Sequence, residues 1–129
     1  MNVSPEVQIW VSKADRDLEA ARRLAQGEPP LPDQVGFFCQ QTAEKYLKAF
    51  LIAAEQVPPR THDVDALVEI CAAVDSAFER LQSVVEGLTE FAVIFRYPEA
   101  WSDKVSADRS MNQAEQVRAL VRQKLGMTE

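Results

Sequence analysis

The sequence of 129 residues has a single histidine, two cysteines and four glycines. His62 has no glutamate three residues before it, so the paired Glu-x-x-His motifs of di-iron bundles are excluded. Cys39 and Cys71 lie far apart without metal-ligand spacing, and we predict that both are small buried hydrophobic residues. No glycine-rich phosphate-binding loop occurs. The sequence therefore predicts no cofactor, no metal site and no catalytic residue of the standard classes.

Long apolar runs and an excess of positive charge are also lacking. The longest apolar runs, residues 49–54 and 91–95, are far shorter than the roughly 20 residues that span a bilayer. Glu6 and Gln8 follow soon after Met1, which is not typical of a secretory signal. We therefore expect a cytoplasmic protein with no membrane partner. The formal charge of −6 disfavours nonspecific binding to nucleic acid, which needs clustered lysine and arginine.

Helical periodicity dominates the sequence that remains. Apolar residues three and four apart predict helices over about 4–26, 33–56 and 106–125, a short helix after Thr61 or Asp63, and a fourth helix over 76–97. Ser4 is expected to cap the first helix, and Gly27 is expected in a left-handed turn beyond it. The second helix is apolar on nearly all sides, so we place it at the centre. These helices predict an all-α fold, an antiparallel up-and-down bundle of four to five helices, as one domain over residues 1–129.

Three polar features interrupt the apolar pattern. On the second helix Gln41, Glu44, Lys45 and Lys48 share one face through spacings of three and four residues. This strip is either a solvated surface or a binding surface. Thr61-His62-Asp63 stands at a helix start, where free amides could receive an anion or simply be capped. Arg96-Tyr97-Pro98 places a cation and an aromatic ring at the end of an apolar helix, where the charge also complements the helix end.

Taken together, these segments resemble the HEPN domain family. The resemblance is carried by Asp17-Leu18 with Ala21, by the run from Phe38 to Leu51, by Thr61-His62-Asp63-Val64 and by Arg96-Tyr97-Pro98. Family members typically read QQAAEKALKALL in the second helix, followed by THDL and later RYP, and the likeness extends over roughly residues 5 to 125. It implies an all-α bundle, usually a homodimer, often encoded beside a minimal nucleotidyltransferase as a toxin–antitoxin-like pair. It also implies a role related to nucleotides or RNA.

One departure from the family limits the activity that the resemblance implies. HEPN ribonucleases are similar in having an arginine followed, after four to six residues, by a histidine that does acid–base work on a phosphodiester. Here the corresponding positions after Arg96 are Trp101, Ser102 and Asp103, and Arg80 is likewise followed by no histidine. The leading hypothesis is therefore a non-catalytic HEPN-type subunit that binds a minimal nucleotidyltransferase, a nucleotide, or both.

If a nucleotide binds, we expect Lys45, Lys48, His62 and Arg96 to line a common recess around its phosphates. Gln41 would belong to the same site, and Tyr97 or Trp101 would be available to stack on a base. Two alternatives stay open. The first is a metal-independent ribonuclease with a rearranged site that uses His62. The second is a ligand-free homodimeric scaffold, in which the polar strip forms hydrogen bonds between helices or subunits.

Overall fold

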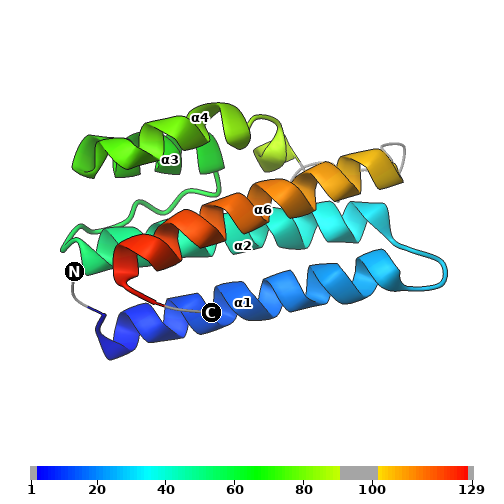
Figure 1. Cartoon of the computed structure of the whole chain (residues 1–129), viewed down its shortest axis with the longest axis horizontal. Coiled ribbons are helices and arrows are strands. Elements are labelled where there is room, and N and C mark those ends of the chain that lie inside the picture. Colours follow the sequence, from blue (N-terminus) through cyan, green and yellow to red (C-terminus); the bar gives the residue numbers. More distant parts are fainter. Residues whose placement is uncertain (1–2, 91–101, 128–129) are drawn as a thin grey trace.

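The computed structural model describes residues 3–90 and 102–127, and every regular element in these ranges is helical (Figure 1). The α-helices are α1 (Pro5–Gln26), α2 (Pro32–Ala53), α3 (Val64–Val74), α4 (Leu81–Val84) and α6 (Lys104–Leu125), with 3₁₀ turns at Ser76–Arg80 and Leu88–Glu90. The predicted all-α helical bundle is confirmed.

The ends of the long helices follow from local chemistry, with two departures from prediction. Ser4 caps α1 as predicted, its hydroxyl accepting from the amide of Val7 at 3.2 Å. Gly27 does not adopt the predicted left-handed turn: its φ is −68°, because the chain runs on in extended form towards the following prolines. The second helix ends at Ala53 instead of Gln56, because Glu55 has a φ of 62°.

Helix α2 is the centre of the bundle, as its apolar sequence predicts. In Figure 1, α1 lies along one side of α2, α6 lies against it, and α3 with α4 lies on the side away from α1. Helix α1 is antiparallel to α2. Helix α6 runs in the same direction as α2, and the thiol of Cys39 on α2 lies 3.5 Å from the sulfur of Met111 on α6. Within α2, Tyr46, Leu47, Phe50 and Leu51 are fully buried.

The predicted fourth helix is wrong over residues 76–90. This segment consists of two 3₁₀ turns around the four-residue helix α4. Gly87 interrupts it with a φ of 81°, a conformation that ends a right-handed helix and that glycine adopts readily. The segment nevertheless covers the core, since the ring centroid of Phe78 lies 4.3 Å from the ring centroid of Phe50 on α2. The predicted end of this helix at Tyr97 lies outside the described residues.

Candidate functional site

The polar strip of α2 is centred on the buried carboxylate of Glu44. One carboxylate oxygen, Oε1, lies 2.9 Å from Nδ1 of His62 and accepts from Nε2 of Gln40 at 3.1 Å. The other, Oε2, accepts from the ammonium group of Lys48 at 3.1 Å. The side chains of Glu44 and Lys48 are only 6% and 9% exposed. The interpretation of this strip as a solvated surface is therefore wrong for these two residues, and we call Gln40, Gln41, Glu44, Lys48 and His62 the Glu44 cluster.

The Glu44 cluster fastens the loop before α3 to the central helix. Gln40 also donates Nε2 to the backbone carbonyl of His62 at 2.8 Å, and its own carbonyl accepts from Nε2 of Gln41 at 2.8 Å. Directly after this attachment, Asp63 caps α3 by accepting from the amide of Ala66 at 3.2 Å. The loop is thus held both through a side chain and through the backbone at the same residue.

His62 and Lys48 are brought together on one carboxylate, as a shared site requires. The imidazole of His62 is 74% exposed although its Nδ1 faces Glu44. The ammonium group of Lys48 also lies 6.0 Å from the ring centroid of Trp10 on α1, at the outer limit of a cation–π contact. Two of the predicted site residues therefore converge, and Gln41 joins them through Gln40.

Lys45 lies outside the Glu44 cluster and pairs with a different carboxylate. Its ammonium group lies 2.5 Å from a carboxylate oxygen of Asp17 on α1, and this pair is about four-fifths buried. The pair joins α1 to α2, whereas the carboxylate that pairs with Lys48 is Glu44 on α2 itself. Arg96, Tyr97 and Trp101, the remaining candidates for the predicted site, lie outside the described residues. The structure thus joins Gln41, Lys48 and His62, and it gives Lys45 a carboxylate of its own.

A second polar cluster was missed by the sequence reasoning. The hydroxyl of Tyr46, in the centre of α2, donates to Asp15 on α1, and Nε of Arg118 on α6 donates to the same carboxylate at 3.0 Å. Arg122, one turn further along α6, approaches it at 3.6 Å. We call these four residues the Asp15 cluster. The only signal in the sequence was a tyrosine among apolar residues at a position that must be buried, which calls for a hydrogen-bond partner.

Burial changes the titration of three groups near the core. Desolvation, together with the hydrogen bond to Asp15, raises the pKa of Tyr46 to about 12. Burial also raises the pKa of Cys39 and of Cys71 to about 12, which makes both thiols poor nucleophiles. Both cysteines are free and buried, which confirms their prediction as small core residues.

The described residues contain no group of metal-binding side chains and no helix that could span a membrane. Within residues 3–90 and 102–127, no group of three or more histidine, cysteine, aspartate or glutamate side chains is placed to hold a metal ion. None of the helices in these ranges has the length and apolar character needed to cross a bilayer.

Comparisons with known proteins give one matching family model and two similar solved structures. The model of the HEPN domain matches residues 7–124. The fold is similar to the crystal structure of TT1696 from Thermus thermophilus, with a TM-score of 0.79, 23% identity, and coverage of 94% of this chain and 99% of that one. It is also similar to ST0689, described as an archaeal HEPN homologue, with a TM-score of 0.71, 25% identity, and coverage of 92% and 96%. No curated protein matches the sequence.

Proposed function

Because the chain belongs to the HEPN domain family, we propose that it acts as a non-catalytic helical subunit that binds a minimal nucleotidyltransferase. The observation that supports this proposal most is that the two candidate phosphate-binding lysines are already paired within the chain. Lys45 and Lys48, the two lysines that a phosphate site would use, each bond to a carboxylate of the same chain. The polar strip therefore carries almost no net positive charge, and it is built to join helices.

The same pairs weigh against a nucleotide site on this strip. A bound phosphate would have to displace Glu44 from Lys48, or share that lysine with a carboxylate about 3 Å away. Removing Glu44 from Lys48 leaves a mostly buried charge without its partner, which costs several kcal/mol. Nucleotide binding through Gln41, Lys45, Lys48 and His62, completed by Arg96 and Tyr97, is thus the weaker form of the proposal.

Charge and sequence also favour a protein partner over RNA. The chain has a net charge of −6, which repels a phosphate backbone at low salt. It has one histidine, His62, and this residue does not follow an arginine at the spacing of the family's ribonucleases. The resemblance further suggests a homodimeric subunit of a toxin–antitoxin-like pair, and we include both features in the proposal.

Co-purification with a minimal nucleotidyltransferase tests the proposal. The chain is mixed with a minimal nucleotidyltransferase from the same organism, beginning with any that is encoded beside its gene, and the mass of the product is measured by size-exclusion chromatography with light scattering. We expect one complex containing both chains. Separate elution of the two proteins would contradict the proposal.

A ribonuclease assay tests the alternative. The purified chain is incubated with structured and with single-stranded RNA in EDTA, beside a His62→Ala variant. We expect no cleavage by either protein. Cleavage by the wild type that disappears in His62→Ala would replace the proposed function with the rearranged ribonuclease.

A further inference from the structure

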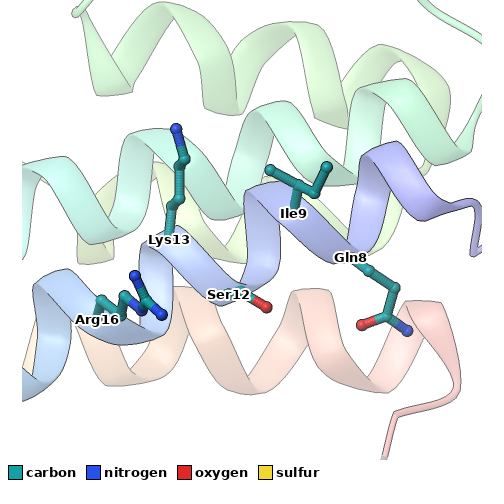
Figure 2. A pocket seen from close by; sticks show the side chains of 5 residues that line it. All are labelled: Gln8, Ile9, Ser12, Lys13 and Arg16. Atoms are coloured by element: carbon teal, nitrogen blue, oxygen red, sulfur yellow. The ribbon is translucent and has the colours of Figure 1, made fainter.

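The outer face of α1 carries a hollow of about 260 Å³, on the side of the helix that points away from the core. Figure 2 shows Ile9 and Lys13 on the edge nearer α2, Gln8 and Ser12 on the opposite edge, and Arg16 one turn further along. Ser12 has the smallest side chain of the five. Ile9, Ser12, Lys13 and Arg16 follow the spacing i, i+3, i+4 and i+7, the four-residue frame into which a facing helix inserts one side chain.

The cations at this hollow differ from the others on α1. Arg22 and Arg23 both contact the carboxylate of Glu19. Lys13 and Arg16 are exposed and make no ion pair with any residue in the part of the chain that the structure describes. In a chain with six more acidic than basic charges, this leaves a local excess of positive charge without an internal partner.

The hollow also has an apolar side. Ile9 is 57% exposed, one of the most exposed large aliphatic residues among those described. It lies next to the small side chain of Ser12, where an inserted aliphatic group would gain contact on two sides. A surface that combines an exposed isoleucine with two cations suits a ligand that is both apolar and acidic.

We propose that this face of α1 is the docking surface for an amphipathic helix of the partner nucleotidyltransferase. The partner helix inserts one aliphatic side chain between Ile9 and Ser12, and aspartate or glutamate residues on its flanks pair with Lys13 and Arg16. This inference rests on the proposed function and adds to it the surface that is used and the chemistry that the surface selects.

A second copy of the chain fits the surface less well. In a two-fold symmetric contact the same patch meets itself, so the interface would gather two copies of Lys13 and Arg16 while the hollow supplies no acidic residue. Like charges placed opposite each other oppose association. A free phosphate group would satisfy the cations but would leave Ile9 exposed, so the two halves of the hollow are used together only by an acidic, apolar helix.

Charge reversal tests the docking surface in the complex. The binding constant for the nucleotidyltransferase is measured for the wild type, for Lys13→Glu/Arg16→Glu, and for Ser12→Leu, which fills the frame. The control Arg80→Glu/Lys104→Glu makes the same change in net charge at exposed positions on other elements. We expect both α1 variants to bind at least about tenfold more weakly while the control binds as the wild type does. Circular dichroism verifies that each variant folds.

The outcomes separate the inference from the proposed function. If the wild type binds and both α1 variants bind equally well, the docking surface is wrong and the proposed function stands. If the control weakens binding as much as Lys13→Glu/Arg16→Glu does, net charge and not this face is responsible, and the surface is again wrong. If the wild type does not bind, the proposed function fails and the docking surface fails with it.

Discussion

The Glu44 cluster and the Asp15 cluster both surround a carboxylate at α2, but they hold different parts of the molecule. Glu44 lies on α2, is almost completely buried, and bonds mainly to its own helix and to the loop at His62. Asp15 lies on α1, is 36% exposed, and joins Tyr46 of α2 to Arg118 of α6. The first cluster fixes a loop, and the second fixes the packing of three helices. Burial, more than the number of contacts, should therefore decide which carboxylate matters more for stability.

The largest effect is expected at Glu44. The side chain of Lys48 is only 9% exposed, and replacing Glu44 with leucine removes the carboxylate that pairs with its ammonium group. Loss of one partner of a buried pair costs about 3–5 kcal/mol of unfolding free energy, comparable to Phe50→Ala in the core. The double variant Glu44→Leu/Lys48→Met should recover most of that loss, because it removes both charges. Urea unfolding measures all three variants, and a cost below about 1 kcal/mol for the single variant would show that the pair is solvated.

A smaller effect is expected at Asp15. Asp15→Ala removes the carboxylate that Tyr46 and Arg118 share, at a partly exposed position. We expect a loss of about 1–3 kcal/mol, and about 1 kcal/mol for Tyr46→Phe, which deletes only the hydroxyl. The double variant should cost less than the sum of the two, because both changes remove the same hydrogen bond. Strict additivity in urea unfolding would contradict a direct bond between Tyr46 and Asp15.

The Asp15 cluster also predicts a loss of stability at alkaline pH. The pKa of Tyr46 is raised to about 12 in the folded chain, whereas an unfolded tyrosine titrates near ~10. Between these values the unfolded chain has released a proton that the folded chain keeps, so unfolding free energy falls as pH rises through this window. Tyr46→Phe should show a shallower fall above pH ~10 in chemical unfolding.

The buried thiols provide the control for that experiment. The pKa values of Cys39 and Cys71 are also raised to about 12, whereas unfolded cysteine titrates near ~8.5. The wild type and Tyr46→Phe both keep these thiols, so both should begin to lose stability at this lower pH. Their curves of unfolding free energy against pH should diverge only where tyrosine ionises. Curves that stay parallel through the alkaline range would show that Tyr46 titrates normally.

The smallest effect is expected at the exposed end of the Glu44 cluster. His62→Ala removes a ring that is 74% exposed, while the backbone carbonyl at the same position still accepts from Gln40. We expect a loss of about 0.5–1.5 kcal/mol and faster amide hydrogen exchange confined to residues 60–64. Lys104→Ala, which breaks an exposed ion pair with Asp108, should change stability by less than about 0.5 kcal/mol. Unchanged exchange around residue 62 would contradict the role of the imidazole in holding the loop.

The sequence predicted the long helices better than the segment between them. Strong periodicity and clear end residues, such as Ser4 before Pro5, determine α1, α2 and α6 almost completely. Residues 76–90 have the same apolar spacing, yet Gly87 and the packing of Phe78 on Phe50 turn them into short helical pieces. Periodicity reports which side chains are buried, and it does not separate one helix from several turns that bury the same side chains.

The candidate site was predicted in part for a similar reason. Spacing along one helix places Glu44 and Lys48 on one face, and the position of Thr61-His62-Asp63 at a predicted helix start drew attention to His62. Spacing cannot show that Lys45 reaches across to Asp17, or that Tyr46 reaches Asp15 and Arg118. Those contacts depend on how α1 and α6 align with α2, which is set by packing between residues far apart in the sequence.

Titration with ATP, performed together with urea unfolding, tests most directly the claim that the polar strip of α2 supports the fold and does not bind phosphate. The wild type and Lys48→Ala are compared in both experiments. If this claim is right, we expect no ATP binding that depends on Lys48, and a clear loss of stability in the variant because the buried carboxylate of Glu44 loses its cation. Saturable ATP binding that disappears in Lys48→Ala while stability is unchanged would contradict it.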